Sequence, residues 1–508
     1  MRVVSYQIIV MAFASAFVTS CGSRVIVPTR TGPVATTTTY ALESVGESMG
    51  LKRDPAIATL LADIDPAHIG HTDSTLVSFG TRNTLSDTLS STHGIGAARR
   101  WIHSQFEQDS RDCGGCLRVS YYGEVQKMGR AQDHEANVVD VLAWLPGRDT
   151  THVVVITGHY DSCICSLGGT YDSVSTAPGA DDDGSGTSAI MELARVFAKH
   201  YPHGLQSSVI FAAVAAEEQG LYGSKELAQH LHDAGYSVIA GMTDDIVGNV
   251  TTENGTTDST SMRIYAADPD NSPSRELGRY AWALDELYLP AFTVLPVWRL
   301  DRIGRGGDHE PYVELGDAGL RFTERLENYN RQHLPTDDLA HVNFGYIANV
   351  ARVNAITVAS LASAPPAPAE ARAFRQGRAM DANGKPIASS SGGQAWTLSW
   401  QPSPGATSYE VLVRQTTSPT WEQIIPLGNV TTCSLHRQLD DEWAGVRAVG
   451  PSGARSIVSS IPGPPRPRPA PAASTTNGAA ASGAAPAPRA PRPFGGQQRQ
   501  PPPPNCGA

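Results

Sequence analysis

Acidic and imidazole side chains that follow two apolar runs constrain the fold of this chain most strongly. The runs Val153–Thr157 and Ser208–Ala216 are short and rich in β-branched or small residues, which is typical of strands buried on both faces. His159 follows the first run, and Glu217 and Glu218 follow the second. Polar groups at the ends of buried strands indicate an α/β sheet with a site at the carboxyl ends of its strands.

Strand-like and helix-like segments alternate between residues 136 and 361, which predicts an α/β fold. We expect a three-layer α/β/α sandwich around a mostly parallel, mixed sheet. The expected strands are Ala136–Pro146, Val153–Thr157, Ser208–Ala216, Ser237–Gly241 and Leu320–Thr323. The expected helices cover Ala189–Phe197, Lys225–Ala234, Ser274–Tyr288 and Phe344–Leu361. Residues 41–133 show helical spacing, so we expect them to pack as helices on the edge of the sheet.

The composition changes after this region. Residues 363–371 are rich in Pro and Ala and are interpreted as a linker. Residues 372–462 contain short alternating runs, which predict a small all-β sandwich. The spacing from Trp400 to Tyr409 resembles that of a fibronectin type III module. Residues 463–508 are dominated by Pro, Ala, Gly and Arg, so we expect them to be disordered.

The first residues resemble a processed export signal. Arg2 precedes an apolar run from Ile8 to Val18 that is too short to span a bilayer, so residues 1–20 are interpreted as a signal peptide. The segment Val18-Thr-Ser-Cys21 resembles a bacterial lipobox, in which the cysteine is lipidated. We therefore expect a bacterial lipoprotein anchored to the membrane through Cys21, facing the periplasm or the exterior, with residues 21–40 as a tether. Simple secretion is the alternative.

Charge and cysteine content narrow the class of partner. The 508-residue chain has a formal net charge of -11 and no basic block, so we expect no nucleic-acid partner. Export favours disulfides, and Cys113-Gly-Gly-Cys116 can close a local bridge; a redox or metal role is the rival. For Cys163 and Cys165 the sequence leaves open whether they pair with that loop. It assigns no oligomeric state.

Three acidic clusters predict a metal centre. Zinc prefers imidazole and carboxylate ligands, and His159 has Asp161 two residues on, where a carboxylate can fix the ring tautomer. The run Asp181-Asp182-Asp183 precedes a helix, where it favours the helix dipole or, if packed together, a cation. Burial of both Glu217 and Glu218 is costly unless one binds metal and the other exchanges a proton.

The segments GHYDS (158–162), APGADDDGSG (177–186) and AAEEQGLYGS (215–224) together resemble the M28 family of zinc peptidases, which includes the bacterial leucine aminopeptidases. The resemblance covers residues 41–362. It implies two Zn²⁺ per chain, with His159 on one zinc, Asp182 as the bridge and Glu218 on the second zinc. It implies Glu217 as general base. The next ligand is Asp245, with Asp244 as its competitor, and the last ligand is His333. It places Asp308 and His309 beside the ligands or in the pocket wall, and Asp161 behind His159.

The chain departs from the family pattern at two positions. Gly307 stands where relatives have Ser, and Gln332 stands before His333 where relatives often have an aromatic or apolar residue. The expected function is a metallo-aminopeptidase that removes N-terminal, preferably apolar, residues from peptides through a metal-bridging water. A carboxypeptidase or a glutaminyl cyclase is the alternative within the fold. A non-catalytic surface binding protein is the alternative of another class.

Overall fold

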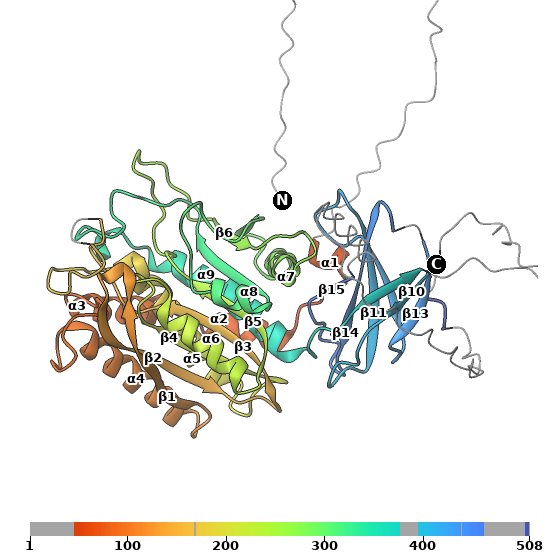
Figure 1. Cartoon of the computed structure of the whole chain (residues 1–508), viewed down its shortest axis with the longest axis horizontal. Helices are drawn as coiled ribbons and strands as arrows, with labels where there is room; N and C mark the ends of the chain where they lie inside the picture. Colours follow the sequence, from red (N-terminus) through yellow and green to blue (C-terminus); the bar gives the residue numbers. More distant parts are fainter. Residues whose placement is uncertain (1–44, 167–168, 376–394, 438, 462–502, 507–508) are drawn as a thin grey trace, which may run out of the picture. The chain divides into compact units, whose positions relative to one another are not determined.

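The computed structural model describes residues 45–166, 169–375, 395–437, 439–461 and 503–506. Its largest element is an eight-stranded sheet with the order β1-β2-β4-β3-β5-β8-β6-β7. Figure 1 labels the strands β1 to β6 of this sheet. The strands are β1 (Arg118–Met128), β2 (His134–Leu145), β3 (Asp149–His159), β4 (Ser207–Val214), β5 (Ser237–Asp244), β6 (Ser261–Ala266), β7 (Thr293–Val297) and β8 (Gly319–Glu324). Four pairings are parallel (β4/β3, β3/β5, β5/β8, β6/β7) and three are antiparallel, so the sheet is mixed and mostly parallel.

Helices cover both faces of this sheet, as the alternation of side chains along β3 shows. Val154 and Ile156 belong to one apolar core together with Ile190 of α5, whereas Val153 belongs to a second core with Leu227 of α6. Successive side chains of a strand point to opposite faces, so β3 is covered on both. The first face carries α2 (Pro55–Ala62), α3 (Pro66–Ser78), α4 (Gly94–Asp112), α5 (Gly186–His200), α7 (Pro273–Tyr288) and α9 (Phe344–Ser363); the second carries α6 (Tyr222–Asp233) and α8 (Glu310–Leu315). The predicted α/β fold is confirmed.

The expectation of an all-helical segment from residue 41 to residue 133 is wrong at β1. This strand pairs with β2 in an antiparallel manner at the edge of the sheet. Most of its residues are exposed or half-buried, including Tyr121 and Val125. Because an edge strand with a solvated face carries no apolar run, its sequence lacks the signal that revealed the central strands.

The region after α9 forms two small antiparallel sheets around their own apolar core, as expected for the all-β part. One sheet has the order β13-β10-β9 and the other β12-β11-β14-β15. Their strands are β9 (Arg372–Arg375), β10 (Ala395–Ser399), β11 (Ser408–Gln415), β12 (Gln423–Leu427), β13 (Thr432–His436), β14 (Glu442–Val449) and β15 (Ser459–Ser460). Trp396 and Leu398 of β10 share this core with Val411 of β11. The likeness to a fibronectin type III module stays a prediction.

The end of the chain differs from the expected disorder at residues 503–506. Cys506 forms a disulfide with Cys433 of β13, and the Ser434 N–H donates to the carbonyl of Pro504 at 2.7 Å. This short segment therefore lies along β13. The predictions for residues 1–20, for the tether at 21–40, for Cys21 and for the rest of the tail fall outside the described residues.

Candidate metal centre

His159 is the last residue of β3 and is completely buried. Its Nδ1 lies 3.2 Å from the carbonyl oxygen and 3.5 Å from Oδ1 of Asp161. A proton on Nδ1 is therefore satisfied by Asp161. This leaves the Nε2 lone pair facing Asp182, whose Oδ1 is 3.2 Å away, and Asp245, whose Oδ1 is 3.9 Å away. A neutral imidazole held in this tautomer is suited to bind a metal ion.

Asp182 lies between two imidazoles. Its Oδ1 faces His159, and its Oδ2 is 3.0 Å from Nε2 of His333, which is also 3.2 Å from Oε2 of Glu218. Two sets of three ligand atoms, each within 4.8 Å of one another, therefore share one carboxylate. We name them the inner group (His159, Asp182, Asp245) and the outer group (Asp182, Glu218, His333).

The donor atoms of both groups fit divalent cations. His159 Nε2, Asp182 Oδ2 and Glu218 Oε1 are buried and accept or donate no hydrogen bond within the described part of the chain. Burying such polar atoms without a hydrogen bond is costly. The negative charge of Glu218, with that of Asp182, raises the pKa of His333 to about 11, so this position favours a positive charge. Imidazole nitrogen and carboxylate oxygen are the ligands of catalytic zinc sites.

The two outer acids of the 181–183 run hold the backbone around the site. Oδ2 of Asp183 accepts from the His159 N–H at 3.0 Å, and its Oδ1 accepts from the Ile246 N–H at 3.3 Å. Oδ1 of Asp181 accepts from the Gly248 N–H at 2.8 Å. The run therefore turns its middle carboxylate toward the ligands and uses its neighbours to fix the ends of β3 and β5.

Of the two acids that compete for one ligand position, the geometry places Asp245 in the inner group. Its Oδ2 lies 2.8 Å from Nη1 of Arg321, which leaves Oδ1 toward His159. Asp244 accepts a hydrogen bond from Asn354 of α9 instead, and burial raises its pKa to about 8. Asp244 therefore faces away from the other ligands.

Glu217 follows β4 and lines a cavity of about 230 Å³ together with Asp182, Glu218 and Asp245. Its backbone N–H donates to Oδ1 of Asp161 at 3.2 Å. Burial raises the pKa of the Glu217 carboxyl well above its usual range. A carboxyl group with a raised pKa beside a reaction site can accept and return a proton near neutral pH.

Asp308 and His309 are buried behind the ligands and are not among the described residues that line the cavity. Asp308 accepts a hydrogen bond of 2.5 Å from the Ser224 hydroxyl, and burial raises its pKa to about 7. Nε2 of His309 lies 2.9 Å from the Leu300 carbonyl, and burial lowers the pKa of this imidazole to about 4. Asp308 therefore joins its segment to α6, and His309 holds the loop at Leu300.

The structure gives a physical reason for Gly307. A Cβ atom at this position would lie 2.9 Å from Nη1 of Arg321. The guanidinium that pairs with Asp245 therefore occupies the space that a serine side chain needs. A glycine at position 307 makes room for the buried arginine.

Sequence reasoning missed three residues that support the ligands. Arg321 is a buried cation on β8, between Leu320 and Phe322 of an expected strand, and a charge between two apolar residues is the available signal. Asp337 accepts from the backbone N–H groups of Asp181 at 2.9 Å and Asp182 at 3.0 Å. Arg82 is buried and donates to the carbonyl of Tyr160 at 2.7 Å, for which the sequence offers no local signal.

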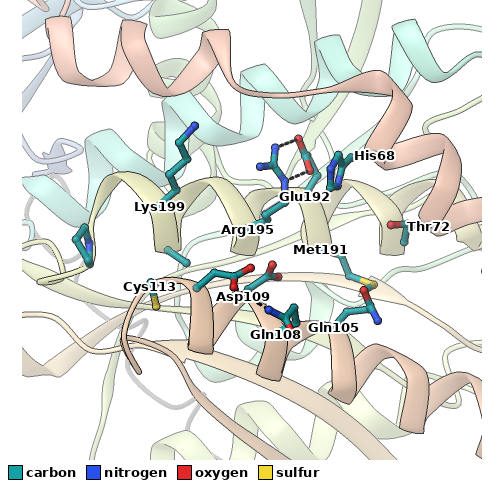
Figure 2. Close-up of a pocket in the computed structure, with 13 residues that line it drawn as sticks. His68, Thr72, Gln105, Gln108, Asp109, Cys113, Met191, Glu192, Arg195 and Lys199 are labelled. Atoms are coloured by element: carbon teal, nitrogen blue, oxygen red, sulfur yellow. Dashed lines mark hydrogen bonds and ion pairs between the residues drawn. The ribbon is translucent and has the colours of Figure 1, made fainter.

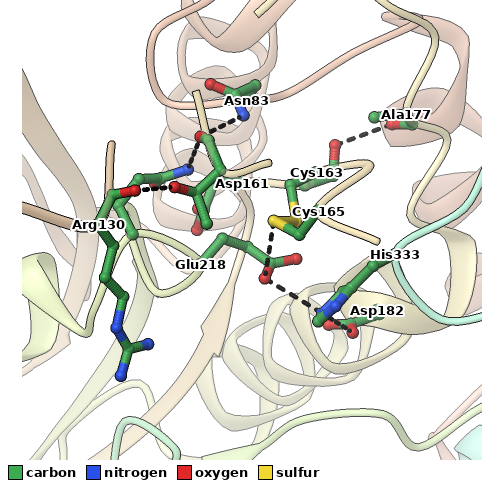
Figure 3. The surroundings of a disulfide bond; sticks show 12 residues. Asn83, Arg130, Asp161, Cys163, Cys165, Ala177, Asp182, Glu218 and His333 are labelled. Atoms are coloured by element: carbon green, nitrogen blue, oxygen red, sulfur yellow. Dashed lines mark hydrogen bonds and ion pairs between the residues drawn. A yellow bond between two sulfur atoms is a disulfide. The ribbon is translucent and has the colours of Figure 1, made fainter. Parts of the chain in front are cut away.

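Figure 3 shows a disulfide beside the outer group. It joins Cys163 to Cys165, and Sγ of Cys165 lies 3.9 Å from Oε2 of Glu218. Cys113 and Cys116 also pair locally, as predicted. The alternative that was left open, pairing between the two loops, does not occur.

A second cavity, of about 580 Å³, is lined by residues of α3, α4 and α5, away from the carboxyl ends of the strands. Figure 2 shows Asp109 there, together with the ion pair between Arg195 and Glu192, whose atoms lie 2.6 Å apart. Each set of three potential metal ligands found within the described ranges includes Asp182 or Glu218. The ligand chemistry is therefore concentrated at the carboxyl ends of β3, β4 and β5.

Comparison with known proteins identifies a family of zinc peptidases. The model of peptidase family M28 matches residues 140–358. A probable zinc metalloprotease of Leptosphaeria maculans is 35% identical, and the match covers 79% of this chain and 95% of the relative. A probable zinc metalloprotease of Pyricularia oryzae is also 35% identical, with coverage of 79% and 84%. Among solved structures, LapA of Legionella pneumophila is similar with a TM-score of 0.49 and 24% identity over 62% of this chain and 77% of that chain. Glutaminyl cyclase of Porphyromonas gingivalis has a TM-score of 0.44 and 16% identity over 58% of this chain and 97% of that chain.

The expectation of a bacterial membrane-anchored lipoprotein is wrong. The curated relatives that cover most of the chain come from fungi, whereas a lipobox is processed by a bacterial pathway. The short motif that ends at Cys21 was therefore overinterpreted. No helix in the described part of the chain is long and apolar enough to cross a membrane.

Proposed function

This chain belongs to peptidase family M28, and we propose that it is a two-zinc aminopeptidase that hydrolyses the N-terminal residue from peptides. The membership makes it a hydrolase of a zinc metalloprotease family. The position of Asp182 carries the finer proposal, since its two oxygens face the imidazoles of different ligand groups at 3.2 and 3.0 Å. A carboxylate placed in this way can bridge two cations.

We assign one zinc to the inner group and one to the outer group. These residues would hold the ions, and zinc would supply Lewis-acid chemistry there, which polarises a carbonyl and lowers the pKa of a water molecule. Asp161 holds the His159 ring through Nδ1, and Asp337 holds the backbone of the bridging residue. Arg321 holds the second oxygen of Asp245. These contacts keep the donor atoms oriented.

Glu217 is the proposed general base. It lines the cavity between the two groups, and its raised pKa suits a group that takes a proton from the attacking water and delivers it to the leaving amine. Asp161 accepts a hydrogen bond from the backbone N–H of Glu217 and so fixes the position of Glu217 relative to His159. Asp161 therefore acts as a positioning residue for both.

The size of the cavity favours an exopeptidase. Its volume of about 230 Å³ is smaller than the roughly 300–1,000 Å³ of most ligand pockets. The space suits one terminal residue and the scissile bond better than an extended peptide. We further propose residues 41–362 as the catalytic domain and residues 372–462 as a separate module.

The test is Glu217→Gln, which keeps size and hydrogen bonding and removes the base. We expect kcat on a leucyl anilide to fall about 10²- to 10⁴-fold while the zinc content stays at the wild-type value. Glu124→Gln, at an exposed position of β1, is the matched control and leaves kcat unchanged. Unchanged kcat in Glu217→Gln would contradict the assigned base.

Substrates with free and acetylated amino groups test the class of peptidase. An aminopeptidase cleaves the free form and spares the acetylated one. Cleavage of both forms, or release of a C-terminal residue from a blocked peptide, would instead indicate a carboxypeptidase. Ammonia release from an N-terminal glutamine without peptide cleavage would indicate a cyclase.

A further inference from the structure

The rim of the catalytic cavity is cationic. Besides the proposed ligands and base, the cavity is lined by three arginines, Arg130, Arg302 and Arg305, and by Thr170, Cys165 and two glycines. Among the described residues that line it, none offers an aliphatic or aromatic side chain. An apolar terminal residue such as leucine therefore meets no matching surface here, although the sequence predicted that preference.

A buried network neutralises one of these arginines. Arg302 lies 3.1 Å from Asp301 and 2.8 Å from Glu327, and Arg263 lies 2.6 Å from the other oxygen of Glu327. Arg321 pairs with Asp301 at 3.2 Å and completes the set with its partner Asp245. Three arginines thus face three carboxylates, and the network is balanced in charge.

Arg305 remains outside this balance. Its nearest carboxylate oxygen in the described structure is Oε2 of Glu327 at 3.9 Å, and Arg302 already binds that oxygen at 2.8 Å. Its hydrogen bond from Nη1, of 2.8 Å, goes to the neutral amide oxygen of Gln332. The charge of Arg305 is therefore available to a ligand in the cavity.

Gln332 fixes the direction of Arg305. It is 5% exposed, its Nε2 donates to Glu327 at 3.3 Å, and its oxygen is thereby turned toward the guanidinium. Gln332 directly precedes His333, so it ties Arg305 to the backbone of the outer group. This contact explains the polar residue at a position where the family pattern often has an apolar one.

Arg130 supplies a second cation on the same rim. It belongs to the turn Gly129–Ala131, which is held down by the buried side chain of Ala131. Oγ1 of Thr170 donates to the Arg130 carbonyl at 2.7 Å and fixes the turn to the loop that lines the cavity. The side chain of Arg130 is exposed, and Figure 3 shows it extending away from the turn.

We propose that Arg305, oriented by Gln332 and assisted by Arg130, binds a carboxylate of the substrate, so that the enzyme selects peptides with an acidic group at the cleaved end. Guanidinium groups bind carboxylates with charge-assisted hydrogen bonds, which are about twice as strong as neutral ones. The carboxylate belongs either to the side chain of an N-terminal Asp or Glu or to the free C-terminus of a dipeptide. The inference rests on the proposed peptidase function.

The first experiment compares N-terminal Glu and Gln in otherwise identical peptides, using the full chain loaded with zinc. We expect kcat/KM to favour Glu by about 10- to 100-fold. If Gln is preferred and the free C-terminus also matters little, the inference is wrong. The C-terminal arm uses Leu-Gly and its amide, where a preference for the free acid places the carboxylate at the C-terminus. If no peptide is cleaved at all, the proposed function itself fails.

Variants then assign the preference to the arginines. Arg305→Met is expected to remove most of the preference for the carboxylate by raising KM for the acidic substrate. Arg325→Met, at an exposed position outside the cavity lining, is the matched control and keeps the preference. Retention of the full preference in the double variant Arg305→Met/Arg130→Met would overturn the proposal.

Two further measurements keep the test decisive. Gln332→Met is expected to weaken the preference through KM alone and Gln332→Asn to restore part of it, since a positioning residue acts through the direction of Arg305. Inhibition of the wild-type enzyme by free glutamate and by glutamine α-amide, which carries no carboxylate, needs no variant. We expect glutamate to inhibit at about 10-fold lower concentration, and equal inhibition would count against the proposal.

Discussion

The inner and outer ligand groups differ in how the protein holds them. In the inner group, His159 ends β3 and Asp245 directly follows β5, their side chains are 0% and 4% exposed, and Arg321 pairs with Asp245. In the outer group, His333 lies on a loop with a φ of 58° and is 25% exposed. The proposed inner ligands are thus fixed by the sheet and by buried charge, whereas the outer group depends in part on the loop that carries His333.

From this difference we expect the two groups to hold a cation with different strength. Ligands fixed by a rigid scaffold need little reorganisation on binding a cation, which favours tight binding. His333 is the most exposed of the proposed ligands, so the outer site is the more accessible one to chelators. We therefore expect the inner site to retain zinc and the outer site to exchange it more readily.

The largest effect is expected where the two groups join. Asp182→Asn weakens both ion sites at once, so we expect kcat to fall on the order of 10³-fold or more and the zinc content to drop below two per chain. Elemental analysis and anilide hydrolysis measure both quantities. Wild-type zinc content with wild-type kcat would remove Asp182 from the bridging role. Asp338→Asn, at a half-buried position that follows the His333 loop and is not a proposed ligand, serves as the control.

A smaller effect is expected on the free energy of unfolding, which should differ between a variant of the inner group and a variant of the outer group. Arg321→Met removes the cation that pairs with the buried carboxylate of Asp245, so we expect the free energy of unfolding to fall by about 3–5 kcal/mol. His333→Gln is expected to cost less than about 1 kcal/mol, because its side chain borders the cavity. Urea unfolding of both variants in the presence of a chelator makes the comparison. Similar losses in the two variants would contradict the distinction between the groups.

The smallest expected effect concerns Asp109, whose substitution should change stability without affecting either ligand group. Burial raises the pKa of Asp109 in the second cavity to about 7. The folded protein therefore binds this proton more tightly than the unfolded chain does. This contribution to stability is complete below about pH 4 and is lost as the pH rises through 7.

Asp109→Asn removes the dependence, so we expect the variant to be more stable than wild type at pH 8 by on the order of 1 kcal/mol, with unchanged kcat. Urea midpoints at pH 5 and pH 8 measure the change. The exposed Asp112→Asn is the matched control. An equal gain at both pH values would show that the titration of Asp109 is not its cause.

The sequence predicts the inner part of the molecule better than its edges. Val153–Thr157 and Ser208–Ala216 are buried on both faces, so their apolar runs reveal β3 and β4 and the positions of His159 and Glu217 after them. The sequence does not reveal β1, because most of its residues are exposed or half-buried and form no apolar run. An apolar run in the sequence reveals a strand that is buried on both faces, whereas a strand exposed to solvent has no such run.

The supporting residues show a second limit. Arg321 pairs with Asp245, and Asp337 holds the backbone of Asp181, which lies 156 positions away in the chain. Such contacts depend on the fold and leave no periodicity in the sequence. The departure at Gln332 was visible, but its hydrogen bond to Arg305 required the structure.

Zinc removal, followed by elemental analysis and activity together, tests the central claim most directly. The account predicts two zinc ions per chain in the active enzyme and stepwise loss on dialysis against a chelator. The ion of the outer group should leave first, about 10-fold faster or more, and activity should fall with it. Full activity in a protein that binds one zinc or none would contradict the account.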